Sequence, residues 1–229
     1  MELSAIAWNK VNHVYQAIID HPFHKKLING TLSNEAFGCY IEQDSLYLKD
    51  FARALALLAA RSQSFPHIAA FLKFAQGALI AEQDMVHQFF RKKLGFKETG
   101  KFTPATLAYT SFLLQECVLE SVEVGVAAIL PCFLIYREVS LYIAKYAGNN
   151  NPFERWISTY SGEEFSQSVD EAIGIFDFLA ASATESTKQR MCESFYKSSI
   201  LEWHFWQDAY EMRAFDDVTL EKNNKKLIV

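Results

Sequence analysis

Glycine and proline are scarce in this sequence, which has 9 glycines and 5 prolines in 229 residues. Most of them fall between long segments in which apolar residues recur at helical spacing. No Asn-Gly or Asp-Gly pair separates two alternating segments, which would be the signal of a β-hairpin. The pattern therefore argues against β-rich folds and predicts an all-α protein.

The sequence also lacks closely spaced cysteines, an apolar leader and a strong excess of one charge. Its four cysteines, Cys39, Cys117, Cys132 and Cys192, show no CxxC spacing, and the first residues, MELSAIAWNKVNHVY, carry charges where a signal peptide is apolar. The formal net charge of -5 is spread along the chain, so there is no basic face for nucleic acid. We expect a cytoplasmic protein with free thiols and no nucleic-acid partner.

No apolar run is long enough to predict a membrane span. The longest, from Val124 to Ile135, has about a dozen residues and contains Pro131, whereas a spanning helix needs roughly 20 apolar residues. We therefore predict a buried helix here and no membrane partner.

The apolar periodicity predicts seven helices, with Gly162 as the point where the sixth would break. Thr103 before Pro104 and Asn151 before Pro152 combine an N-cap oxygen with a proline, which is typical of a helix start. A chain of this length can bury one sizeable core, so we expect a single helical domain over residues 1–229, with a loose tail at 214–229. The predicted helices cover residues 3–20, 33–62, 66–94, 104–120, 122–147, 152–180 and 184–213.

An acidic residue interrupts the apolar face of the second predicted helix. Asp44 lies within this face, and a buried carboxylate has to be paired, hydrogen-bonded or protonated. Asp44 therefore either joins two helices or belongs to a functional site. The face consists of Phe37, Tyr40, Ile41, Tyr47, Leu48, Phe51, Leu55 and Leu58.

The last predicted helix repeats this anomaly at Glu202. Its role is either an internal salt bridge or membership, with Asp44, of a polar pocket walled by aromatic rings. Two inward acids on separate helices favour the pocket. The face around Glu202 consists of Met191, Phe195, Ser198, Phe205, Trp206 and Ala209.

Cys132 follows Pro131 within the apolar segment AAILPCFLIYREVS. A proline inside a helix removes one backbone hydrogen bond, so we predict a kink at this point. A buried free cysteine is usually an inert packing residue. Tyr136 one turn later and the two inward acids favour a nucleophile instead, because a reactive thiol needs polar neighbours and access. We expect the other three cysteines to be packing residues.

Several segments, taken in order, resemble the TenA/thiaminase II family, whose fold is like that of haem oxygenase. The most specific matches are QDxxYL, LPCxxxYRE, WxxxYS and ExxFW, and the likeness covers about residues 8 to 213. The resemblance implies an all-α, haem-oxygenase-like multi-helix bundle. The matching segments are FGCYIEQDSLYLKDFARALALLAARS, LAYTSFL, AAILPCFLIYREVS, WISTYSGEEF and SSILEWHFWQDAYE.

The resemblance assigns roles to the residues already singled out. By position, the nucleophile of the family falls on Cys132, its acid/base glutamate on Glu202 and its substrate-binding aspartate on Asp44. The remaining substrate-binding residues fall on Tyr47, Tyr109, Tyr136, Tyr160 and Phe205.

The resemblance also implies an activity and an assembly. It implies hydrolysis of the aminomethyl pyrimidine of degraded thiamin to the hydroxymethyl compound, with cleavage of thiamin itself as a second activity. It implies a small-molecule pyrimidine substrate, no metal or organic cofactor, and a homotetramer. Ser140 and His204 stand where glycine and an apolar residue are expected, which bears on substrate preference or packing. Trp156 and Trp203 are candidates for subunit contacts or for the core.

Three alternatives stay open. A di-iron oxidase would use Glu82, Glu120 and Glu202 with His87, although Glu82 and His87 are five residues apart and do not share a helix face. A haem protein would need His21 or His24 as axial ligand, and we expect both, like His13 and His67, near helix ends or surfaces. A non-catalytic pyrimidine-binding or regulatory protein would use Asp44, Cys132 and Glu202 for internal packing only.

Overall fold

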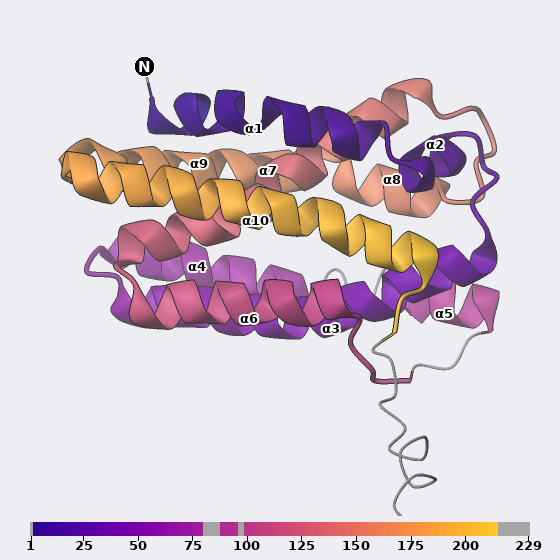
Figure 1. Cartoon of the computed structure of the whole chain (residues 1–229), viewed down its shortest axis with the longest axis horizontal. Helices are drawn as coiled ribbons and strands as arrows, with labels where there is room; N and C mark the ends of the chain where they lie inside the picture. The colour runs from indigo at the N-terminus through magenta and orange to yellow at the C-terminus, as the bar shows by residue number, and fades with distance from the viewer. Residues whose placement is uncertain (1, 80–87, 96–98, 215–229) are drawn as a thin grey trace, which may run out of the picture.

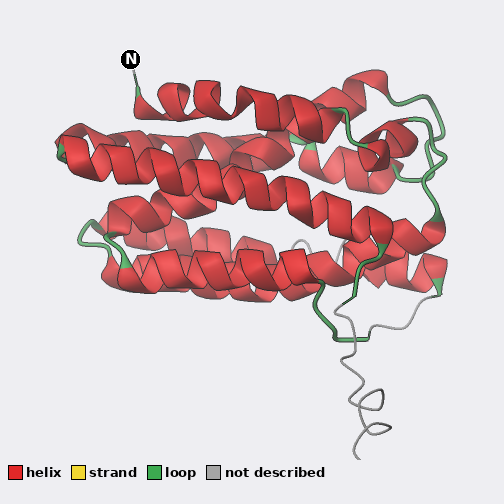
Figure 2. Ribbon diagram, in the orientation of Figure 1, coloured by secondary structure: helices red, strands yellow, loops and turns green. Residues whose placement is uncertain are grey.

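The computed structural model describes residues 2–79, 88–95 and 99–214, and these residues form helices and loops without a strand (Figure 2). This confirms the all-α prediction. The helices are α1 (Leu3–Ile19), α2 (Pro22–Ile28), α3 (Asn34–Arg61), α4 (Phe65–Gly77), α5 (Gln88–Leu94), α6 (Pro104–Leu119), α7 (Val122–Tyr146), α8 (Glu154–Tyr160), α9 (Glu163–Ser182) and α10 (Glu185–Glu211).

The long helices agree with the sequence-based boundaries to within two residues at each end. The predicted segment 152–180 divides into α8 and α9 on either side of Gly162, as expected. The predicted helix 66–94 is described as α4 and α5, and residues 80–87 between them lie outside the described residues. The short helix α2 was missed, because seven residues are too few to establish a helical periodicity.

One of the two predicted helix starts is confirmed and the other is wrong. The Thr103 hydroxyl accepts a hydrogen bond from the backbone N–H of Thr106, and Pro104 is the first residue of α6. Asn151 instead accepts from the N–H of Phe153 and donates to the carbonyls that end α2, so α8 begins only at Glu154. The tail expected at 214–229 lies, apart from residue 214, outside the described residues.

The three longest helices, α3, α7 and α10, form the centre of the bundle. α10 packs against α1, α3, α6 and α7, and α3 also packs against α4 and α6. In Figure 1 the long helices run along the longest axis, and the short helices α2, α5 and α8 gather near one end. Residues on the inner faces of α3, α7 and α10 therefore meet in the interior.

α7 is the most apolar helix and belongs to the core. By length and composition it could cross a membrane, but 78% of its most apolar 18-residue window is buried inside the protein. This agrees with the predicted buried helix. α7 is continuous through Pro131, and the predicted kink at this residue stays a prediction.

Gly125 allows α7 to pack closely against α3 and α6. A Cβ atom at this position would lie 2.8 Å from Leu58 Cδ2 and 3.3 Å from Cys117 Cα. Gly125→Ala is therefore expected to lower the free energy of unfolding by roughly 1–3 kcal/mol, although alanine favours helices. Gly174→Ala is the matched control, since a Cβ there meets nothing within 4 Å and is expected to stabilise α9 by up to about 1 kcal/mol. Urea denaturation compares the two, and equal stabilisation would contradict the packing argument.

Candidate active site

A cavity of about 430 Å³ opens among α3, α4, α7, α8 and α9. Its wall combines apolar groups such as Phe51 and Phe74 with polar groups from several helices. The rim carries Lys73, Ser158, Thr159, Glu163, Glu164 and Ser168. Among the site residues predicted from the sequence, those that line the cavity are Asp44, Tyr47, Cys132, Tyr136 and Tyr160.

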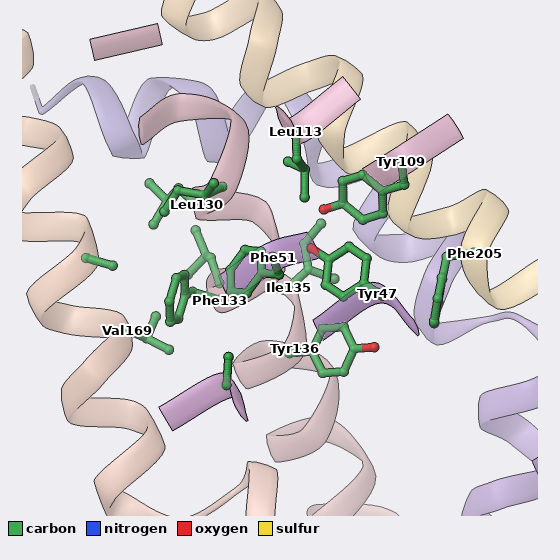
Figure 3. Close-up of a cluster of buried hydrophobic side chains, with 14 of the residues drawn as sticks. Tyr47, Phe51, Tyr109, Leu113, Leu130, Phe133, Ile135, Tyr136, Val169 and Phe205 are labelled. Atoms are coloured by element: carbon green, nitrogen blue, oxygen red, sulfur yellow. The ribbon is translucent and has the colours of Figure 1, made fainter. Parts of the chain in front are cut away.

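The other three predicted residues lie behind this wall rather than on it. Glu202, Tyr109 and Phe205 are buried, with exposed fractions of 1%, 1% and 2%. Figure 3 shows the Tyr47 ring between those of Tyr109 and Tyr136, with Phe205 to one side. The Tyr47 ring centre lies 5.0 Å from that of Tyr109 and 5.9 Å from that of Phe205. All eight predicted residues therefore belong to one region, with five on the cavity surface and three supporting it.

Cys132 and Glu202 both lie close enough to the same three tyrosines to raise their pKa values. Burial is the main reason why the pKa values of Tyr47, Tyr109 and Tyr136 are well above the ordinary value, and negative charge at Cys132 and at Glu202 raises each of them further. Electrostatic coupling of this kind requires short separations. The thiol of α7 and the carboxyl of α10 therefore share one polar cluster. Cys132 is half-buried, so its sulfur is accessible from the cavity.

Asp44 is a buried carboxylate that two tyrosines hold in place. The hydroxyl of Tyr40 donates to Oδ2 at 3.4 Å, and that of Tyr136 donates to Oδ1 at 3.5 Å. Tyr40 in turn accepts a 2.9 Å hydrogen bond from Trp156 Nε1 and stacks on Trp206. Tyr136 and Asp44 both line the cavity, so this network fixes the carboxylate at its surface.

Two members of that network were missed as site residues by sequence reasoning. Tyr40 precedes Asp44 by one helical turn, which was a usable signal. Trp156 was a candidate for a subunit contact or for the core, and the structure places it in the core with no exposed surface. Only tertiary packing brings Trp156 of α8 within hydrogen-bond distance of Tyr40 of α3, so this contact could not be predicted from the sequence.

Glu202 is protonated at neutral pH. Burial raises its pKa from an ordinary value of 4.5 to about 8, the charge of Asp44 raises it further, and the hydrogen bond from Tyr109 opposes the change. That bond joins the Tyr109 hydroxyl to Oε1 at 2.8 Å. Glu202 forms no ion pair within the described part of the chain, which argues against the internal salt bridge considered from the sequence.

The raised pKa of Glu202 makes folding stability depend on pH. Between about pH 4.5 and 8 the folded protein keeps a proton that the unfolded chain releases, so a rise in pH across this window favours unfolding. Glu202→Gln cannot ionise, and its free energy of unfolding relative to the wild type is expected to rise across the window, by at most about 3 kcal/mol at pH 7. Urea denaturation of both proteins at pH 5 and pH 8 measures this difference. A difference that does not change with pH would contradict the raised pKa.

Two further hydroxyls prepare the cavity for a ligand. The Tyr47 hydroxyl is buried beside Cys132 and Tyr109. Tyr47 also lines the cavity, so its hydroxyl can bond to a bound molecule. Ser140, noted as a departure from the family pattern, donates at 2.7 Å to the backbone carbonyl of Tyr160. Ser140 thereby ties the end of α8 to α7 and helps to position Tyr160 in the cavity wall.

The residues considered for metal and haem sites have other positions. Glu120 is not turned toward Glu202: it caps the end of α6 and forms an ion pair with Arg190. Glu82 and His87 lie outside the described residues, and the described part of the chain contains no group of three or more His, Cys, Asp or Glu side chains placed to hold a metal ion.

His21 stands at a helix end, as expected, because it is the N-cap of α2, but the expectation of solvated positions for His21 and His24 is wrong. Both are buried, with exposed fractions of 3% and 0%. The ring of His24 bonds to the carbonyl of Ile18 at 2.7 Å and packs against Trp206. Burial lowers the pKa of His24 to about 3. His21 caps α2 and His24 lies within it, and α2 is the helix that the sequence did not predict, so their inward position was not foreseen.

The chain is similar in sequence to known proteins over most of its length. The chain is 32% identical over 206 residues to the aminopyrimidine aminohydrolase of Bacillus subtilis, with 88% of this chain and 87% of that protein covered. It is also 32% identical over 204 residues to the thiamine biosynthesis multifunctional protein ThiED of Corynebacterium efficiens. That match covers 88% of this chain and 27% of ThiED, so the chain spans about a quarter of that larger protein.

Solved structures agree with the fold. A TenA homologue from Pyrococcus horikoshii OT3 superposes with a TM-score of 0.83 at 26% identity, covering 92% of this chain and 99% of that one. A domain with a heme oxygenase-like fold from Shewanella denitrificans has a TM-score of 0.71 at 13% identity, which supports the haem-oxygenase-like bundle. Residues 8–212 match the TENA/THI-4/PQQC family, and the chain belongs to this family.

Proposed function

We propose that the protein hydrolyses an aminopyrimidine of the thiamin pathway, converting an aminomethyl pyrimidine to the hydroxymethyl compound, and that it also cleaves thiamin. The Bacillus subtilis relative named aminopyrimidine aminohydrolase supports the first activity. The observation that carries the proposal is that Cys132 of α7 and Asp44 of α3 line one tyrosine-rich cavity, with Glu202 of α10 buried behind its wall. The cavity volume of about 430 Å³ is sufficient for a single pyrimidine ring with its substituent.

The first step of the proposed mechanism is covalent. The Cys132 thiol gives up its proton, and its sulfur adds to an electron-poor carbon of the pyrimidine, forming a C–S bond, while Glu202 donates its proton to a ring nitrogen as negative charge develops there. The raised pKa of Glu202 suits this role, because the carboxyl group is protonated before the reaction. Asp44, held by Tyr40 and Tyr136, accepts a hydrogen bond from the amino group on the ring.

The second step replaces the leaving group. The bond between the exocyclic methylene and its substituent breaks. The amine takes up the proton released by the Cys132 thiol and departs as ammonia, whereas thiamin releases the neutral thiazole and this proton passes to solvent. The hydroxyl of water then adds to the methylene, the C–S bond breaks, the remaining proton of the water restores the Cys132 thiol, and Glu202 regains its proton from the ring. Covalent catalysis of this type divides one difficult substitution into easier steps. Tyr47 and Tyr160 supply hydrogen bonds and flat walls for the ring, and Phe205 packs against Tyr47 from behind the wall.

A product assay tests this proposal. The purified protein is incubated separately with the aminomethyl pyrimidine and with thiamin, and the hydroxymethyl pyrimidine, ammonia and thiazole are quantified. The expected result is release of the hydroxymethyl pyrimidine from both substrates, with one equivalent of ammonia or thiazole. Tight binding of the pyrimidine without turnover of either substrate would instead favour the non-catalytic alternative.

Assembly and location remain predictions from the resemblance and the composition. We expect a homotetramer, which sedimentation of the purified protein measures, and a cytoplasmic location with free thiols.

A further inference from the structure

The charges at the mouth of the cavity do not balance. Lys73 of α4 is paired with Glu171 of α9, with Nζ 3.0 Å from Oε2. The other two charged residues of the rim, Glu163 and Glu164, are exposed and form no ion pair within the described part of the chain. Glu163 accepts a 3.5 Å hydrogen bond from the amide of Gln167, which carries no charge. Two carboxylates therefore stay uncompensated where the cavity opens to solvent.

The elements around the mouth offer little positive charge to offset these carboxylates. The N-terminus of α9 carries a partial charge of roughly +0.5, which is smaller than the two full negative charges in its first turn. Arg137 of α7 is paired with Asp170 of α9. Arg155 of α8 lies over the ring of Phe89, 4.5 Å from its centre, and does not line the cavity. We therefore expect a negative potential at the mouth.

The two proposed substrates carry positive charge on the part that leaves. The thiazolium ring of thiamin is a permanent cation. The aminomethyl group is a primary amine, which like the side chain of lysine is largely protonated in neutral water. The hydroxymethyl product has no such charge. Once inside, the ammonium group can return its proton to solvent, so the neutral amine is still available for the reaction.

The shape of the cavity turns this charged substituent toward the mouth. Cys132 and Asp44, which bind the pyrimidine in the proposed function, lie on the cavity surface. Behind Tyr47 the wall is closed by the buried rings of Tyr109 and Phe205. The open side is the rim, so the substituent of a ring bound in this way extends toward the first turn of α9. A ligand that enters passes the same two carboxylates.

We propose that Glu163 and Glu164 are specificity-determining residues, which favour entry of ligands with a cationic substituent over neutral and anionic ones. The identity of the ligand rests on the proposed function, whereas the charge selectivity of the mouth does not. Carboxylates at a cavity mouth raise the association rate of cations, and salt weakens the effect. A purely structural role, in which the two acids only stabilise the start of α9, predicts no selectivity by charge.

The thiol of Cys132 measures the potential of the mouth without any substrate. Three methanethiosulfonate reagents are added separately, one with a trimethylammonium group, one neutral and one with a sulfonate group, and mass spectrometry follows modification at Cys132. Compared with a small thiol in solution, Cys132 is expected to favour the cationic reagent and disfavour the anionic one. The double variant Glu163→Gln, Glu164→Gln is expected to reduce the cationic preference by about 3–10-fold at low salt. Salt at about 0.5 M is expected to have a similar effect on the wild type.

Two further variants separate charge from structure. Lys73→Gln leaves Glu171 without its partner, so the cationic preference is expected to increase. Glu185→Gln is the matched control, because Glu185 also lies in the first turn of a helix, but beyond the far end of α9. The 20 residues of α9 span roughly 30 Å, several times the screening length of about 10 Å, so this variant is expected to leave the preference unchanged. The proposal would be overturned by a wild type without cationic preference, by a double variant that retains the preference, or by a decrease in Lys73→Gln.

Turnover connects the mouth with the proposed function. If the protein cleaves thiamin, kcat/KM in the double variant is expected to fall by the same factor as the reagent preference, with kcat nearly unchanged. Binding of the neutral hydroxymethyl pyrimidine, measured by calorimetry, is expected to stay the same, which verifies that the cavity is intact. Absence of hydrolysis combined with the expected reagent preference would reject the proposed function and keep the charge selectivity of the mouth.

Discussion

Replacement of Cys132 by serine is expected to reduce turnover of the aminomethyl pyrimidine by on the order of 10³-fold or more, with binding changed only a few-fold. A serine hydroxyl ionises far less readily than a thiol and is a much weaker nucleophile toward the ring. The substitution changes little volume in a half-buried position, so the fold and the cavity are expected to persist. Product formation under saturating substrate measures kcat, and titration with the hydroxymethyl product measures binding.

Cys39→Ser provides the control for this experiment. Cys39 is also half-buried and unpaired, but it lies outside the cavity wall, and burial raises the pKa of its thiol to about 11. Activity in this variant is expected to stay near that of the wild type. Near-normal turnover by the Cys132→Ser protein would exclude the covalent mechanism, whatever the result for Cys39.

Glu202→Gln is expected to lower kcat by about 10²–10⁴-fold, the usual contribution of a general acid and base. Glutamine preserves the shape of the side chain and can still bond to Tyr109, but it cannot deliver a proton to the ring or recover it. The residual activity is therefore expected to lose the alkaline limb that deprotonation of Glu202 produces near pH 8 in the wild type. Steady-state kinetics between pH 6 and 9 measure both effects.

Glu116→Gln is a suitable control, because Glu116 is another buried acid whose carboxyl group bonds to a serine of α10. It bonds to Ser194 and not to a tyrosine beside Cys132, so its substitution is expected to leave kcat within a few-fold of the wild type. A Glu202→Gln variant with normal kcat and an unchanged pH profile would show that Glu202 is a structural residue only.

The fold was predictable wherever a helix was long. α3 and α10 have 28 and 27 residues, which is enough for apolar spacing to define both the helix and the face that it buries. α2 has seven residues, and its existence depends on the cap at His21 and on contacts with distant helices. The error over the two histidines of α2 followed from this, since a residue cannot be assigned to a face of a helix that is not predicted.

The candidate site was predictable to the extent that polar residues interrupt apolar faces. Asp44 and Glu202 were identified in this way, and Cys132 by its position after a proline. The contacts around them were not predictable, because the bonds from Trp156 to Tyr40 and from Tyr109 to Glu202 join helices that are far apart in the sequence. The position of a side chain on its helix follows from periodicity, whereas its partners on other helices depend on the packed structure.

The burial of Glu202 has a consequence for the history of such proteins. An acid whose pKa is raised by burial lowers the free energy of unfolding at neutral pH, and the proposed reaction is one reason for a lineage to retain it. In a duplicated copy that is no longer selected for catalysis, we expect glutamine to replace glutamate at this position and the free energy of unfolding at neutral pH to increase. The amide in an otherwise intact cavity would then mark a descendant that still recognises the ring but no longer transforms it.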